Sequence, residues 1–84
     1  MIRLRLYSRP GCTLCDELRQ EVEGIVADLP HEWEVVEVDT DPELARRYGG
    51  LVPVLFVNGR LFARVRLPRL AARLRLRRAA GVRD

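Results

Sequence analysis

The sequence contains no lysine and few other reactive side chains. All 15 of its cationic residues are arginine, and it has one histidine, one tryptophan and two cysteines. No run of about 18 apolar residues occurs, which excludes a membrane-spanning helix, and no membrane partner is expected. The first residues alternate apolar side chains with arginine and lack the apolar core of a secretion signal. We therefore expect a cytoplasmic protein.

The scarcity of cysteine and histidine limits the roles that these residues can have. A reducing cytosol disfavours structural disulfides, and a bridge between Cys12 and Cys15 would constrain very little chain. Structural zinc needs about four ligands, whereas the chain offers these two cysteines and His31. A closed metal site would need a second copy or a bound small thiol. We expect no metal, and a metal or iron–sulfur carrier remains an alternative. We interpret His31 as a surface residue that leads into a strand.

The length of the chain sets the number of domains. With 84 residues, of which 48% are apolar, it can form one modest core. A chain of this size buries about 60–65% of its unfolded surface, which leaves too little for a second core. No linker, internal repeat or low-complexity tract divides it. We expect one domain over residues 1–84, and a monomer.

Charge is divided unevenly along the chain. Residues 1–43 carry 4 arginines and 11 acids, a net charge of −7, whereas residues 44–84 carry 11 arginines and one acid, a net charge of +10. In the last predicted helix, Arg69, Arg73 and Arg77 form a stripe, which we interpret as a solvated or internally paired face. The stripe lacks the aromatic and groove-reading residues usual in nucleic-acid binding, so no nucleic acid is expected. Docking of an acidic protein partner through this helix remains an alternative function.

The first half of the chain predicts a strand, a helix and a second strand. Apolar residues alternate with arginine over residues 2–7, which predicts a strand, and a loop follows over 8–11. Apolar residues then recur at spacings of three and four, which predicts an amphipathic helix over 12–29. β-Branched and aromatic residues predict a second strand over 33–38.

The second half predicts a short helix, a hairpin and a last helix. An acidic N-cap and a proline at the first helical position predict a helix over 42–48. The apolar run 54–57 precedes Asn58-Gly59, a strong hairpin signal, so a return strand is expected over 60–66. Pro68 opens the last helix, whose expected apolar side carries Leu70, Ala71 and Leu74. The order β-α-β-α-β-β-α predicts an α/β fold with a four-stranded mixed sheet flanked by helices.

The two cysteines lie at the start of the first predicted helix. The free N–H groups and the positive dipole end of a helix favour an anion, so a cysteine there forms a thiolate more readily. Cys12 would be the nucleophile, and Cys15, one turn later on the apolar face, the shielded resolving thiol. Arg9 would stabilise the thiolate further, whereas Asp16 and Glu17 act in the opposite direction. The alternative is a pair of small buried side chains without redox function.

The segments "YSRPGCTLC" and "LVPVLFVNG", in this order of elements, resemble a glutaredoxin-like protein of the thioredoxin superfamily, in particular the small bacterial glutaredoxin-like group. The resemblance covers essentially the whole chain. It implies a thioredoxin-like fold and a thiol–disulfide oxidoreductase. It also implies that Pro53 is cis beside the cysteines, and that the backbone of Val52 pairs with a bound peptide or glutathione. Tyr7 and Arg9 match positions that line the thiol site, where Arg9 would meet a glutathione carboxylate.

These inferences define one candidate site. Its catalytic residues are Cys12 and Cys15. Thr13 and Leu14, which lie between the cysteines, are expected to help set the reduction potential. The predicted substrate-binding residues are Tyr7, Arg9, Thr13, Leu14, Val52 and Pro53. The expected partners are a disulfide-bearing protein or small-thiol substrate and a thiol reductant.

The chain departs from the proteins that it resembles near the cysteines, where Thr13-Leu14 replaces the usual Pro-Tyr pair of glutaredoxins, and after the hairpin. Gly11 precedes the first cysteine, where thioredoxins carry tryptophan. Ala63-Arg64-Val65-Arg66 replaces the Gly-Gly-x-Asp segment with which glutaredoxins hold the glutamyl end of glutathione. We therefore expect no tightly bound cofactor, and glutathione at most as a co-substrate bound in an unusual manner.

Overall fold

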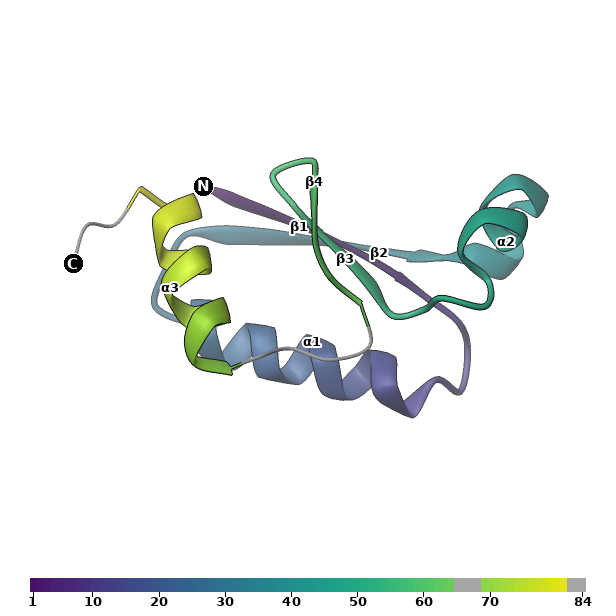
Figure 1. Ribbon diagram of the computed structural model, residues 1–84, viewed down its shortest axis with the longest axis horizontal. Coiled ribbons are helices and arrows are strands. Elements are labelled where there is room, and N and C mark those ends of the chain that lie inside the picture. The colour runs from purple at the N-terminus through teal and green to yellow at the C-terminus, as the bar shows by residue number, and fades with distance from the viewer. Residues whose placement is uncertain (65–68, 82–84) are drawn as a thin grey trace.

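The chain forms a four-stranded sheet with α-helices packed against it (Figure 1). The computed structural model describes residues 1–64 and 69–81, and only the backbone of residues 63–64 and 69–72. The elements in chain order are β1 (Ile2–Ser8), α1 (Thr13–Val26), β2 (His31–Glu37), the 3₁₀ helix η1 (Val38–Thr40), α2 (Pro42–Tyr48), β3 (Val54–Val57), β4 (Arg60–Arg64) and α3 (Arg69–Ala79).

The strand order in the sheet is β2-β1-β3-β4. β1 pairs with β2 in parallel and with β3 antiparallel, and β3 pairs antiparallel with β4. This confirms the predicted element order and the mixed four-stranded sheet. In Figure 1, α1 and α3 lie along the same face of the sheet, and α2 lies beyond the end of the strands. Among the described residues, no helix has the length and apolarity that crossing a lipid bilayer requires.

The face of the sheet under α1 and α3, here called the covered face, contains the core. Alternation along β1 directs Ile2, Leu4 and Leu6 to this face, and each is at most 2% exposed. Burial of such a side chain contributes about 1.5–3 kcal/mol to folding. The other buried members of this core are Leu18, Val22, Val26, Leu55, Val57 and Leu76.

The opposite face, here called the open face, carries the other residues of β1, which are Arg3, Arg5 and Tyr7. The register places Arg3 beside Glu32 and Arg5 beside Glu34 of β2, and both pairs form ion pairs. Their side chains are more than half exposed, so each ion pair contributes at most about 1 kcal/mol. Along Arg3 and Arg5 the open face is therefore polar, whereas the covered face is apolar.

Helix α1 is shorter than predicted. Cys12 is its N-cap rather than its first residue, and the helix ends at Val26 instead of residue 29. The last predicted residues form a turn, in which the Leu29 N–H donates to the Val26 carbonyl over 2.8 Å. Pro30 then leads directly into β2, and its carbonyl accepts a 3.0 Å hydrogen bond from Ile2 N–H.

Strand β2 begins at His31, two residues before the predicted start, and ends at Glu37. Val38, predicted as the last strand residue, begins η1 and is fully buried. The helix predicted over 42–48 is confirmed as α2. The Asp41 carboxylate caps it by accepting a 2.9 Å hydrogen bond from Glu43 N–H.

The predicted hairpin turn is confirmed at Asn58 and Gly59. Both residues have positive φ, at 51° and 82°, which the tight turn between β3 and β4 requires. The side chain of Asn58 accepts a 2.9 Å hydrogen bond from Arg3 N–H and so fastens the turn to β1. Of the return strand predicted over 60–66, residues 60–64 form β4; residues 65–66 and Pro68 lie outside the described residues.

The buried side of α3 differs from the prediction. Leu74, expected on the packed side, is 44% exposed, whereas Leu76 is fully buried. Ala79 and Ala80 pack against the same core, at the three- and four-residue spacing from Leu76 that defines one helix face. The side chains of Leu70 and Ala71 are not among those described.

Candidate active site

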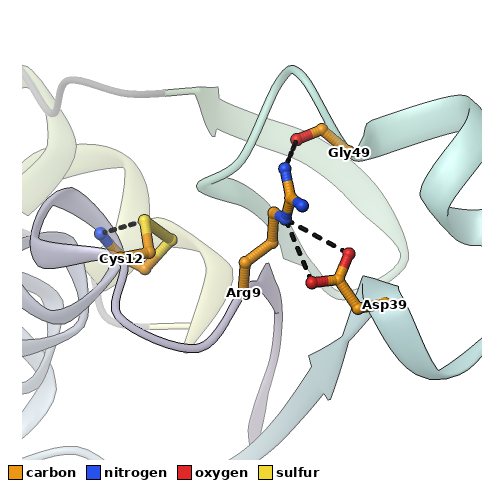
Figure 2. The surroundings of a disulfide bond; sticks show 5 residues. Arg9, Cys12, Asp39 and Gly49 are labelled. Carbon is orange, nitrogen blue, oxygen red and sulfur yellow. Dashed lines mark hydrogen bonds and ion pairs between the residues drawn. A yellow bond between two sulfur atoms is a disulfide. The ribbon is translucent and has the colours of Figure 1, made fainter.

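The two cysteines lie where β1 passes into α1. Gly11 has φ 73°, which allows the chain to turn sharply before the helix. Cys12 then caps α1, and Cys15 lies on its first turn. The two residues are joined by a disulfide, with their Cα atoms 5.3 Å apart. The spacing of the motif therefore brings the two sulfurs together, as redox chemistry requires (Figure 2).

The two sulfurs have different surroundings. Cys15 is 2% exposed, whereas Cys12 is partly exposed. The Sγ of Cys12 accepts a 3.1 Å hydrogen bond from the backbone N–H of Cys15 (Figure 2). In the reduced protein, this donor and the helix dipole would stabilise negative charge on Cys12. The more exposed of the two sulfurs is thus also the one that accepts a hydrogen bond from the start of α1.

Arg9, directly after β1, is held away from the sulfurs. Its Nε lies 3.2 Å from both carboxylate oxygens of Asp39, and its Nη1 donates to the Gly49 carbonyl over 3.1 Å. Figure 2 shows the side chain extending toward these two residues rather than toward the disulfide. Its backbone carbonyl accepts a 3.2 Å hydrogen bond from Cys12 N–H. Arg9 therefore links the cysteine loop to η1 and to the end of α2.

Asp39 and Gly49 were absent from the residues that the sequence singled out. A signal for Asp39 does exist, because β1 and β2 are parallel neighbours in which Ser8 pairs with Glu37. Residues just beyond the carboxyl ends of such strands gather at one edge of the sheet. Arg9 and Asp39 both occupy this edge, and their opposite charges suggest the ion pair.

Tyr7 belongs to an aromatic cluster on the open face. Its ring stacks on Tyr48 of α2 with centroids 4.6 Å apart, and it meets the edge of Phe56 at 5.7 Å. The cluster fastens α2 to the sheet, because Tyr48 and Phe56 also meet at 6.4 Å. The part of Tyr7 in lining the thiol site stays a prediction.

The remaining candidate residues lie on both sides of the cysteine loop. Thr13 and Leu14 are exposed in the first turn of α1, with Leu14 at 49%. Val52 is partly exposed, the Val52–Pro53 peptide is cis, and Pro53 is buried directly before β3. Their roles in substrate binding stay predictions. The segment predicted to replace the glutathione grip, residues 63–66, has no described side chains, and residues 65–66 lie outside the described chain.

A hollow in the described surface lies away from the cysteines. It has a volume of about 720 Å³ and lies on the open face among Arg3, Arg5, Tyr7, Tyr48 and Phe56. Neither cysteine lines it. The hollow is lined by these ion-paired and aromatic side chains together with Met1, Leu4 and Asn58, and it is separate from the disulfide.

The described residues hold no cluster suited to a metal ion, and the single histidine lies away from the cysteines. No cluster of three or more cysteine, histidine or acidic side chains suited to a metal ion occurs within residues 1–64 and 69–81. His31 is not a surface residue as interpreted, since its side chain is only 15% exposed. Its Nδ1 lies 2.7 Å from the Leu29 carbonyl and its Nε2 lies 2.9 Å from the Glu23 carboxylate, far along α1 from the cysteines.

A thioredoxin fold with a Cys-x-x-Cys pair at the start of its first helix is the class that these features define. A mutant thioredoxin from Halobacterium salinarum NRC-1 shares this fold, with a TM-score of 0.62 and 23% identity over 99% of this chain and 78% of that one. The sequence matches the family model Glutaredoxin-like domain (DUF836) over residues 3–75. The chain belongs to this glutaredoxin-like family of the thioredoxin superfamily.

Two solved structures are similar at the level of sequence as well. Protein XcR50 from X. campestris is 33% identical over 87% of this chain and 96% of its own, with a TM-score of 0.66. Protein Ne2328 from Nitrosomonas europaea is 30% identical over 80% of this chain and 81% of its own, with a TM-score of 0.69. No curated protein sequence matches the chain.

Proposed function

We propose that this protein is a thiol–disulfide oxidoreductase in which Cys12 is the nucleophile and Cys15 the resolving thiol. The observation that carries the proposal is the asymmetry of the bonded pair. Cys12 is partly exposed and accepts a hydrogen bond from the start of α1, whereas Cys15 is 2% exposed. Membership of a glutaredoxin-like family supports the same chemistry.

The first step starts from the reduced protein. The Cys12 thiolate attacks one sulfur of the substrate disulfide, and the substrate S–S bond breaks as a new bond to Cys12 forms. The leaving sulfur departs as a thiolate and takes a proton from solvent. The backbone N–H of Cys15, which donates to the Cys12 sulfur even in the bonded pair, would donate more strongly to the thiolate and so stabilise the attacking state. The product is a mixed disulfide between Cys12 and half of the substrate.

The second step uses the buried thiol. Cys15 loses its proton to solvent and attacks the Cys12 sulfur, which expels the second half of the substrate as a thiolate. Two electrons have passed from the protein to the substrate, and the bonded pair seen in the structure is the oxidised product. A dithiol reductant reverses the two steps and restores the starting state. The proposed substrates are disulfides of proteins or small thiols.

Two substitutions of the same kind test these roles. Reduced protein is mixed with bis(2-hydroxyethyl) disulfide, free thiols are alkylated, and the intact mass is measured. Cys12→Ser should abolish disulfide reduction, because no thiol remains that a substrate can reach. Cys15→Ser should accumulate the mixed disulfide, seen as an added mass of half the reagent. An equal rate for Cys12→Ser and the unaltered protein contradicts the proposal.

A further inference from the structure

Arg9 is the cation closest in sequence to Cys12, and it follows the strand that leads to the cysteine loop. A free guanidinium at this place would attract the carboxylates of an anionic disulfide and could bind one through two parallel hydrogen bonds. In the structure, Nε faces both oxygens of Asp39, and Nη1 donates to the Gly49 carbonyl. The guanidinium is therefore already occupied by an internal carboxylate.

The charges around the cysteine loop follow from this pairing. Arg9 and Asp39 together carry no net charge, and the exposed residues that follow on α1 are Asp16 and Glu17. The arginine-rich helix α3 lies at the other end of α1, where Arg77 pairs with Asp28 (Figure 1). Among the side chains that the structure describes, those that flank Cys12 in the sequence are thus neutral as a pair or negative, although the whole chain has a net charge of +3.

We propose that Asp39 determines specificity by withholding Arg9 from substrate carboxylates, so that the protein prefers neutral and cationic disulfides to anionic ones. The preference rests on the proposed function and narrows its substrate class. Glutathione disulfide, which carries carboxylates, belongs to the disfavoured group. Arg9 and Asp39 are 48% and 43% exposed, so their ion pair is of the weak, exposed kind. A disulfide whose carboxylate must displace Asp39 from Arg9 should therefore be reduced about two- to fivefold more slowly.

The test is a single turnover, which needs no second reductant. Fully reduced protein transfers two electrons to one disulfide, forms the Cys12–Cys15 bridge and releases two thiols. Three small disulfides are compared: cystamine, which is cationic, bis(2-hydroxyethyl) disulfide, which is neutral, and dithiodipropionate, which is anionic. Each rate is divided by the rate of dithiothreitol with the same disulfide, which removes differences in leaving-group reactivity. The number of protein thiols that remain at each time is measured by alkylating them and determining the intact mass of the protein.

At an ionic strength of about 0.1 M, where charges act over about 10 Å, the normalised rate for cystamine should exceed that for dithiodipropionate about fivefold. At about 1 M the range falls to about 3 Å, and the ratio should approach one. Equal normalised rates at low salt, or a preference for dithiodipropionate, would overturn the proposed specificity. Failure to reduce any of the three disulfides would instead overturn the proposed function.

Asp39→Asn tests the residue itself. The substitution frees Arg9, so the rate with dithiodipropionate relative to cystamine should rise about two- to fivefold. A general change in Cys12 reactivity cancels in this ratio. Glu21→Gln removes the same charge from an exposed site nine residues beyond Cys12, about 13 Å along the helix axis, and should leave the ratio unchanged at 0.1 M salt.

The double variant Arg9→Gln/Asp39→Asn separates two causes. If the freed arginine binds the substrate carboxylate, most of the gain in Asp39→Asn should disappear when Arg9 is also replaced. If the rate with dithiodipropionate relative to cystamine rises as much in the double variant as in Asp39→Asn, only the lost negative charge matters. That result would overturn the proposal that Asp39 acts by withholding Arg9. An unchanged ratio in Asp39→Asn would overturn the role of Asp39.

Discussion

The two faces of the sheet use the same strand in opposite ways. On the covered face, Ile2, Leu4 and Leu6 of β1 are sealed beneath α1 and α3. On the open face, the alternate residues of β1 form exposed ion pairs with β2, and an aromatic cluster that holds α2. The difference indicates that stability resides mainly on the covered face. The contacts on the open face make small and independent contributions to stability, and they hold α2 and β2 in position.

The largest effect should come from the covered face. Leu55 of β3 is fully buried, and Leu55→Ala should lower the free energy of unfolding by about 2–5 kcal/mol through lost contacts and a residual cavity. The matched control is Leu61→Ala on β4, where the side chain is 51% exposed and the cost should stay within about 0.5 kcal/mol. Urea denaturation of the oxidised protein measures both. Equal losses would contradict the division between the faces.

A smaller effect should come from the aromatic cluster on the open face. Tyr48→Ala removes the ring that stacks on Tyr7 and meets Phe56, and should cost about 2 kcal/mol, of which the ring pairs supply about 0.5–1.5. Exchange of the α2 backbone amides with deuterium should also become faster. Tyr48→Phe keeps the ring and should be close to neutral. The cluster would have no such role if both variants lost the same stability.

His31 lies at the junction of α1 and β2 and makes folding depend on pH. The hydrogen bond with the Leu29 carbonyl, assisted by the Glu23 carboxylate, raises the pKa of His31 above its ordinary value of about 6.5 against the opposing effect of burial. Because the folded state binds this proton more tightly than the unfolded state, protonation of His31 stabilises the folded protein. The contribution is fully present at pH values below the ordinary pKa. The contribution is lost as the pH rises through the raised pKa.

The free energy of unfolding of the oxidised protein should therefore fall as the pH is raised from about 6.5 through the raised pKa of His31. The oxidised form is used because its bonded cysteines do not titrate. His31→Gln should remove the dependence, which urea denaturation at several pH values would detect. An unchanged slope in this variant would assign the dependence to another group.

The smallest effect should come from the ion pairs of the open face. Glu34→Gln breaks the pair with Arg5, whose side chain is 55% exposed, and should cost about 0.2–1 kcal/mol. The cost should vanish at about 1 M salt, where charges are screened within about 3 Å. Thermal unfolding at two salt concentrations gives the comparison. A cost that survives high salt would point to packing rather than charge.

Local patterns in the sequence were sufficient to predict most of the fold. Alternation over β1, the Asp41 cap of α2 and the Asn58-Gly59 turn each depend on neighbouring residues, and the structure has all three. The placement of Cys12 and Cys15 at the start of α1 depends on local signals in the same way. Such features are readable because their partners lie within a few positions.

Features that depend on distant partners were not predicted. The pairing of Arg9 with Asp39 joins residues 30 positions apart, and only the parallel register of β1 and β2 brings them together. Leu74 was wrongly assigned to the buried side of α3, because arginine, leucine and alanine follow one another so closely in this helix that its sequence does not single out one apolar face. Contact with the core selects the face of Leu76.

The fluorescence of the single tryptophan, Trp33, should depend on the part of the fold in which it lies. The indole N–H of Trp33 donates to Glu23 over 2.9 Å, and the Arg19 guanidinium lies 5.5 Å from the ring centroid. Glu23 is eleven residues beyond Cys12, about 16 Å along the axis of α1, so the indole has its contacts far from the sulfurs. Tryptophan emission should therefore report unfolding of the α1–β2 junction and stay constant when the disulfide is reduced. Fluorescence can follow stability in this protein independently of its redox state.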